Sequence, residues 1–263
     1  MKRILIVGNW KMNLNVQASS LLLHRLQQHI KPHRNIEVVL APSLVALQPL
    51  SLEIDTRVFR LAAQNAFYKD VGAYTGEVSF TMLRGLVHYV IIGHSERRIY
   101  FNETLEIVRD KVQAAIRNDI APILCVGETK RERAAGETKR VIHDQLTTAL
   151  ANLTSDEVER VVVAYEPVWA ISTFGTGDPA KPDEIHEAIK WIRHILKDMY
   201  GQQISEDVRV IYGASVDAEF VSGILGLDGV DGLLPGAASL NYKKFSAIVD
   251  SAYQLSLKSE SKP

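Results

Sequence analysis

A single carboxylate, Glu166, closely follows the apolar run Val161–Ala164, and the segment after it, Pro167–Ala180, is rich in glycine and threonine. A carboxylate at the end of a buried strand can serve as a general base when a closing segment excludes water from it. It can equally be an acid that solvates the strand end, beside a loop that only connects two elements. The neighbouring strand ends decide between these interpretations.

Other strand ends carry groups with complementary chemistry. His94 follows the apolar run Tyr89–Ile92, and Lys11 follows Ile4–Val7. An imidazole can donate a hydrogen bond to a developing oxyanion, and an ammonium group can neutralise it. His94 and Glu96 also form the H-x-E pattern of zinc deaminases, but that signature needs two further cysteines. Cys125 is the only cysteine in the chain, so we expect no metal site.

Two short turns of small residues could hold an anion. Gly213–Ser215 and Pro235–Ala237 each follow an apolar run and precede a predicted helix, so they present backbone N–H groups to a phosphate. Each signal alone is modest. Their arrival at successive strand ends, together with a base, an imidazole and a cation, predicts one pocket for a phosphorylated substrate.

Predicted strands and predicted helices alternate along the chain, and this alternation must position the candidate side chains. Continuous apolar runs, which are typical of strands buried on both faces, recur along the chain: Ile4–Val7, Val38–Leu40, Phe59–Ala63, Tyr89–Ile92, Pro122–Val126, Val161–Ala164, Val208–Ile211 and Val230–Leu234. Stripes at helical spacing lie between them, and the clearest is Ile185, Ile189, Ile192, Leu196 and Met199.

Eight strand–helix units in about 250 residues predict an α/β fold, a single-domain (β/α)8 barrel over residues 1–255. A doubly wound open sheet has the same local pattern. The barrel is favoured because no G-x-G-x-x-G nucleotide motif follows the first apolar run. The remaining residues, 256–263, are expected to form a disordered tail.

The composition excludes several classes of function. The chain has 263 residues, 46% of them hydrophobic and 23% charged, with a net charge of −1. A balanced charge attracts neither nucleic acid nor an anionic membrane surface. No apolar stretch approaches the roughly 20 residues that a membrane helix needs, and the start lacks the apolar core of a signal peptide. We therefore expect a soluble cytoplasmic protein.

Several motifs together resemble those of the triosephosphate isomerase family, in order and at the family's spacing along nearly the whole chain: "GNWKMN", "AQNAFYKDVGAYTGEVS", "VIIGHSERR", "PILCVGET", "VVAYEPVWAI" and "IYGASV". The resemblance implies a (β/α)8 barrel that interconverts dihydroxyacetone phosphate and glyceraldehyde 3-phosphate without a cofactor, as an isomerase of glycolysis and gluconeogenesis.

The resemblance also assigns roles to residues. Glu166 matches the general base and His94 the electrophile, which donates from neutral imidazole. Asn9 and Lys11 match the pair that contacts the substrate, and Glu96 matches the acid that contacts the lysine. The backbone groups that hold phosphate correspond to Ser215, Gly236, Ala237 and, in the segment that closes over the substrate, Gly175.

The chain departs from the family's pattern around the phosphate. The closing segment is about three residues longer, with Ser172–Phe174 as the insertion, and proline and alanine replace the usual valine and glycine at Pro235 and Ala237. Likewise Ala214 replaces a glycine, which requires a negative φ there. Two alternatives therefore stay open: an isomerase of a four-carbon ketose phosphate, and a non-catalytic protein that binds phosphorylated metabolites.

The resemblance further implies a homodimer. The segment Val71–Ser79 resembles the loop that family members insert into a partner subunit, where Thr75 approaches the partner's Asn9 and Lys11. As an ordinary surface loop, it would expose the unusually apolar pair Ala73–Tyr74 at its tip. We therefore expect two copies of the chain to complete each other's pockets.

Overall fold

The computed structural model describes residues 2–171 and 180–260. Eight parallel strands form a closed barrel in which each strand pairs with its neighbours in sequence, and β8 pairs with β1. The strands are β1 (Ile4–Asn9), β2 (Ile36–Ala41), β3 (Phe59–Ala63), β4 (Tyr89–Ile92), β5 (Ala121–Val126), β6 (Val162–Tyr165), β7 (Arg209–Tyr212) and β8 (Gly232–Leu233). The eight predicted apolar runs are thus confirmed as strands, and the barrel replaces the open-sheet alternative.

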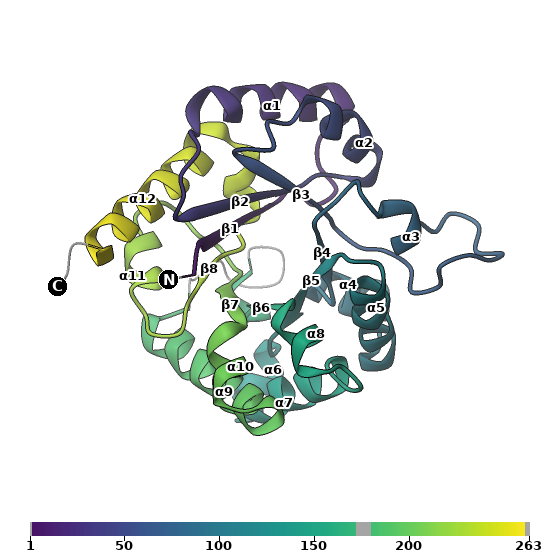
Figure 1. Ribbon diagram of the computed structural model, residues 1–263. Coiled ribbons are helices and arrows are strands. Elements are labelled where there is room, and N and C mark those ends of the chain that lie inside the picture. Colours follow the sequence, from purple (N-terminus) through teal and green to yellow (C-terminus); the bar gives the residue numbers. More distant parts are fainter. Residues whose placement is uncertain (1, 172–179, 261–263) are drawn as a thin grey trace.

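Helices surround the barrel on the outside (Figure 1). They are α1 (Val16–His29), α2 (Leu44–Glu53), α3 (Phe80–Leu83), α4 (Ser95–Tyr100), α5 (Leu105–Arg117), α6 (Lys130–Ala134), α7 (Thr138–Ala149), α8 (Ser155–Glu159), α9 (Pro182–Tyr200), α10 (Gln202–Asp207), α11 (Val221–Leu225) and α12 (Tyr242–Glu260), with the 3-10 turns η1 (Val168–Ala170) and η2 (Ala237–Leu240). The predicted stripe on α9 packs inward, with Ile185, Ile189 and Ile192 buried.

Alternation along each strand divides the core into two layers. In β1, Leu5 and Val7 point into the barrel, whereas Ile6 packs against the surrounding helices. In β5, Ile123 and Cys125 face the interior in the same way. Strands that are buried on both faces favour apolar residues at successive positions, which explains why most of the runs are continuous.

A charged cluster fills the barrel interior at the amino ends of the strands. The Tyr89 hydroxyl donates to Glu37 Oε1 at 2.8 Å, and Arg209 donates to Glu37 Oε2 at 2.8 Å and to the Tyr89 oxygen at 2.7 Å. Burial disfavours ionisation of Glu37, but Arg209 and Tyr89 outweigh it and hold the pKa of Glu37 below its usual value. Charged side chains therefore lie inside the barrel at the amino ends of the strands, at the opposite end from the predicted functional residues.

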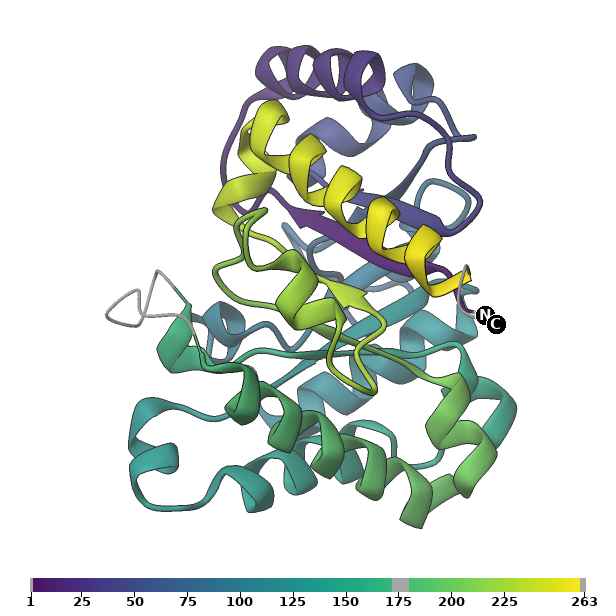
Figure 2. The same ribbon diagram turned by 90° about the vertical axis from the view of Figure 1, so that its left-hand side faces the viewer.

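The last helix differs from the sequence-based expectation. The structure continues α12 through Ser256 as far as Glu260, where a disordered tail was predicted. Ala252 and Ser256 are one helical turn apart and both are buried, so this turn still has an inward face. Figure 2 shows α12 along the outside of the barrel beside β1, and the two elements are in contact.

Candidate active site

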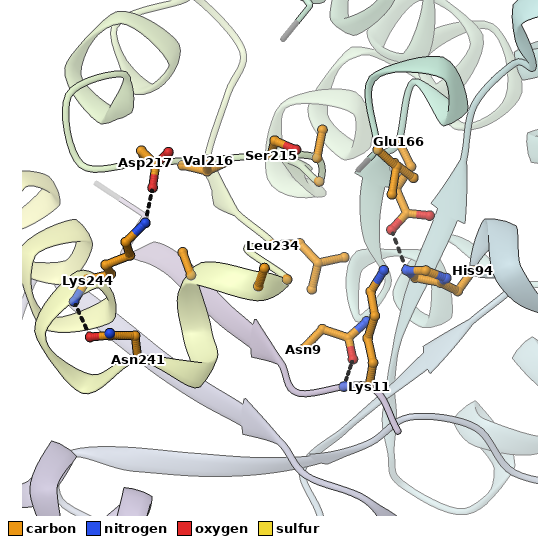
Figure 3. Close-up of a pocket in the computed structure, with 16 residues that line it drawn as sticks. Asn9, Lys11, His94, Glu166, Ser215, Val216, Asp217, Leu234, Asn241 and Lys244 are labelled. Atoms are coloured by element: carbon orange, nitrogen blue, oxygen red, sulfur yellow. Dashed lines mark hydrogen bonds and ion pairs between the residues drawn. The ribbon is translucent and has the colours of Figure 1, made fainter. Parts of the chain in front are cut away.

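A pocket of about 320 Å³ opens at the carboxyl ends of the strands. Most of the predicted site residues line it, as the strand-end argument requires: Asn9, Lys11, His94, Glu166, Ser215, Gly236 and Ala237. Figure 3 shows Glu166 and His94 facing each other at one end, with Asn9 and Lys11 beside them. Glu96 does not line the pocket but contacts Lys11. Gly175 and the insertion Ser172–Phe174 lie outside the described residues.

Glu166 is held in place by the neighbouring strand end. Its carboxylate is buried, with Oε1 at 3.3 Å from His94 Nε2 and Oε2 accepting a long hydrogen bond of 3.4 Å from the backbone N–H of Ser95. Both donors follow β4, and the carboxylate follows β6, so the closed barrel brings the two strand ends together. Because both contacts are long, the carboxylate can give them up and accept a proton from a substrate instead.

The hydrogen bonds of His94 define which ring nitrogen carries its proton. The backbone N–H of Glu96 donates to His94 Nδ1 at 3.2 Å, as part of the start of α4. Nδ1 is thus an acceptor, and in neutral imidazole the proton must lie on Nε2. Nε2–H points to Glu166 and the pocket, where it can donate to a substrate oxygen.

Lys11 occupies an unusual backbone conformation. Its φ is 51°, in the left-handed region, and its N–H is taken up by Asn9 Oδ1 at 3.1 Å. Gln64 donates to the Lys11 carbonyl at 2.8 Å from the end of β3. The side chain then reaches Glu96, with 2.6 Å between Nζ and Oε1. Strain held by specific partners is typical of functional positions.

Two glycines make room for Glu166. A Cβ on Gly127 would lie 1.9 Å from the Glu166 carbonyl oxygen, and a Cβ on Gly213 would lie 3.1 Å from Glu166 Cγ. The ends of β5 and β7 therefore approach the end of β6 as closely as glycine allows. The Glu166 carboxylate can occupy its position only because Gly127 and Gly213 have no side chain.

The opposite end of the pocket is built from backbone. Within the described residues, the N–H groups of Ser215, Gly236 and Ala237 have no protein acceptor. Pro235, which has no N–H, is buried just before them. Ala214 has no positive φ, so its replacement of the family's glycine causes no strain. Free N–H groups after β7 and β8 form the kind of anion site that such barrels use.

A buried acid supports the chain beyond Glu166. Glu128 is fully buried, and its Oε1 accepts from Trp169 Nε1 at 2.8 Å and pairs with Arg133 at 3.1 Å. The Tyr165 hydroxyl donates to Oε2 at 3.2 Å. Burial raises the pKa of Tyr165, and the Glu128 charge raises it further. This network ties the start of the segment after Glu166 to the barrel.

Sequence reasoning missed several residues of the site. Gln64 was not assigned a role, because its hydrogen bond to the Lys11 carbonyl becomes visible only in the folded geometry. Asp217, Asn241 and Lys244 line the pocket but lie on segments that carried no motif. The only signal for them is position, because they follow the small-residue turns after β7 and β8.

Comparison with known proteins agrees with this geometry. The family model described as triosephosphate isomerase matches residues 4–252. A triosephosphate isomerase of Chloroherpeton thalassium is 44% identical over 254 residues, covering 96% of this chain and 100% of that protein. Those of Clostridium botulinum and Dehalococcoides mccartyi are 42% and 40% identical, covering 95% and 94% of this chain and 100% and 96% of their own lengths.

The part of the chain that the structure describes has neither a membrane-spanning helix nor a cluster of metal ligands. In residues 2–171 and 180–260, no helix has the length and apolar character needed to cross a membrane. In the same ranges, no group of three or more histidine, cysteine, aspartate or glutamate side chains is placed to hold a metal ion.

Proposed function

The chain belongs to the triosephosphate isomerase family, and from that premise we propose how its pocket interconverts dihydroxyacetone phosphate and D-glyceraldehyde 3-phosphate. The reaction moves one proton between neighbouring carbons and a second proton between the two oxygens that they carry. It needs no oxidant, because the electron pair of the broken C–H bond enters the enediolate and forms the new C–H bond on the neighbouring carbon. The enzyme serves glycolysis and gluconeogenesis, and we infer that it does so in the cytoplasm.

Glu166 acts as the base. One carboxylate oxygen takes the proton from the carbon beside the carbonyl, and the same group returns a proton to the neighbouring carbon. The observation that supports this proposal is that Glu166 and His94 line the same pocket side by side, with 3.3 Å between Oε1 and Nε2. His94 donates from Nε2 to the oxygen that gains charge.

Lys11 supplies positive charge at the same oxygen and at the phosphate. Its pairing with Glu96 holds the ammonium group at the pocket, and its stem lies near the phosphate loop, since a Cβ on Gly236 would be 3.5 Å from Lys11 Cε. Asn9 orients the Lys11 backbone. The free N–H groups of Ser215, Gly236 and Ala237 bind the phosphate, in line with the family's pattern.

A steady-state assay tests these roles. Glu166→Gln keeps the shape of the side chain but loses the base, so kcat should fall roughly 10³-fold while phosphate binding persists. The wild-type protein should turn over triose phosphates far better than four-carbon ketose phosphates. Retention of most of the kcat by Glu166→Gln would refute the assignment of the base. A preference for four-carbon substrates would refute the choice of substrate.

We also infer a homodimer in which the loop around Thr75 completes the neighbouring pocket. The loop before α3 extends outward from the ring of helices (Figure 1), and residues 71–77 are exposed. Large apolar side chains are exposed on and near it, with Val71 at 84%, Met82 at 69% and Met12, next to Lys11, at 96%. A second copy of the chain would cover this apolar surface.

Sedimentation measures the assembly directly. Val71→Glu should shift the protein toward a monomer and lower its activity, because it places a charge in the covered surface. Leu52→Glu is the matched control. Leu52 is as exposed as Val71, at 83%, but it lies near the carboxyl end of α2 and not on the loop around Thr75. A wild-type protein that is monomeric and fully active at assay concentrations would contradict the proposed dimer.

A further inference from the structure

Two charged side chains lie at the end of the pocket away from Glu166. Lys244 and Asp217 line the same cavity as the catalytic residues, and Figure 3 shows them opposite Glu166 and His94, with Leu234 between. Lys244 lies in the first turn of α12, and Asp217 lies in the loop after β7. Both elements follow the small-residue turns that were assigned to the phosphate.

The position of Lys244 is unfavourable for its own helix. Asn241 caps α12 by accepting from the N–H groups of Lys243 at 3.0 Å and Lys244 at 3.2 Å. The first turn of a helix favours acidic side chains, because the helix dipole is positive there. This first turn carries two lysines and no acid. A lysine kept at a position that is unfavourable for the helix indicates that Lys244 has a function.

The partner of Lys244 holds it weakly. The distance from Lys244 Nζ to Asp217 Oδ1 is 3.6 Å, and the two side chains are 62% and 61% exposed. Exposed ion pairs of this kind add little to stability and are screened by salt. Lys244 can therefore leave Asp217 at small cost when a stronger anion arrives.

The charge of a bound phosphate is not balanced by Lys11 alone, so a second cation in the pocket would strengthen binding. The Lys11 ammonium lies 2.6 Å from Glu96, whereas the N–H groups at the phosphate end are neutral donors. Of the described residues that line the cavity, Lys244 is the basic side chain besides Lys11. The substrate phosphate carries nearly two negative charges, so it attracts Lys244 more strongly than the single charge of Asp217 does.

We propose that Lys244 and Asp217 form an exchangeable ion pair that captures the phosphate group of the substrate: Lys244 leaves Asp217 for the incoming phosphate and guides it to the N–H groups after β7 and β8. The proposal rests on the proposed function, because it adds an electrostatic step to binding at the same site. It makes Lys244 a determinant of specificity for phosphorylated substrates. Asp217 competes with the phosphate for Lys244 and so weakens binding.

Matched charge variants test the pair. Lys244→Gln should lower kcat/KM for glyceraldehyde 3-phosphate by roughly three- to tenfold at low ionic strength, through KM and not kcat. Lys243→Gln is the control, because Lys243 has the same charge on the same helical turn but does not line the pocket. Asp217→Asn should change kcat/KM in the opposite direction and raise it about twofold or more.

Three further measurements separate the proposal from a structural effect. The loss in Lys244→Gln should shrink toward unity at an ionic strength of about 0.5 M. It should be absent with D-glyceraldehyde, which has no phosphate group. Unfolding of Lys244→Gln should occur at the wild-type temperature or slightly above it, since a cation leaves the helix start.

The results also distinguish this proposal from the proposed function. Inorganic phosphate should bind Lys244→Gln more weakly than wild type, whether or not the protein turns over triose phosphates. Phosphate binding therefore tests the ion pair, and turnover tests the proposed isomerase activity. Equal losses in Lys244→Gln and Lys243→Gln would overturn the pair. A loss in Asp217→Asn, or a change in kcat alone, would overturn it as well.

Discussion

Replacing Gly213 by alanine should slow the chemical step without affecting phosphate binding. The added Cβ would lie 3.1 Å from Glu166 Cγ and 3.2 Å from Leu234 Cδ2, which is closer than ordinary contact. Gly213 has no positive φ, so the backbone accepts alanine and the crowding must be relieved by side chains. The added Cβ would also lie 3.3 Å from Leu234 Cβ, which the backbone fixes, so we expect the Glu166 side chain to move by a few tenths of an ångström.

The size of the effect follows from that displacement. Because a misplacement of about 1 Å can cost roughly 10²-fold in rate, a shift of a third to a half of this distance should lower kcat about three- to tenfold. The KM should stay near the wild-type value, since Gly213 itself donates no N–H to the phosphate in the proposed site. Crowding should reduce the free energy of unfolding by about 1–3 kcal/mol.

A coupled assay with triose phosphates, run on protein whose folding is checked by thermal unfolding, measures both constants. Gly223→Ala is the control, because Gly223 lies in α11 and its Cβ would meet no atom within 4 Å. Its kcat should remain within about twofold of wild type. Full kcat in Gly213→Ala, or an equal loss in Gly223→Ala, would contradict this prediction.

Two predictions concern the charged cluster at the amino ends of the strands. Arg209→Met removes the nearer of the two arginines that pair with Glu37 and leaves only Arg3, at 3.4 Å, so denaturant unfolding should show a loss of up to about 3–5 kcal/mol, and Glu37→Gln added to that variant should recover part of it. The folded pKa of Glu37 is below its unfolded value, so its contribution is present above about pH 5 and lost as pH falls through the folded pKa. Unfolding free energies measured between about pH 6 and pH 3 should therefore decline less steeply in Glu37→Gln than in wild type, and equal slopes would contradict this.

The strands and the core of the pocket could be predicted from the sequence because the barrel imposes strong local patterns. A parallel strand buried on both faces requires a continuous apolar run, and the closed barrel brings every strand end to one rim. The positions of His94 and Glu166 at this rim follow from these two facts, and the quoted motifs predict their roles.

The remaining features depend on contacts between segments that are distant in sequence. Gln64 reaches the Lys11 carbonyl across 53 positions of the chain, and the quoted motif that contains Gln64 does not reveal this contact. Lys244 resembles any surface lysine of a helix until the fold places it in the pocket. The extension of α12 was missed because its polar composition hides a buried turn at Ala252 and Ser256.

The left-handed backbone of Lys11 has an evolutionary consequence. Glycine, asparagine and aspartate tolerate a positive φ, whereas lysine pays about 1–2 kcal/mol for it. Selection for stability alone would therefore favour glycine or asparagine at position 11, and the catalytic role proposed for Lys11 opposes that replacement. In a lineage that kept this barrel but abandoned the isomerase reaction, position 11 should be among the first to change, while the buried Glu37–Arg209 pair should persist. The residue at position 11 is thus a marker by which lapsed relatives can be told from working enzymes.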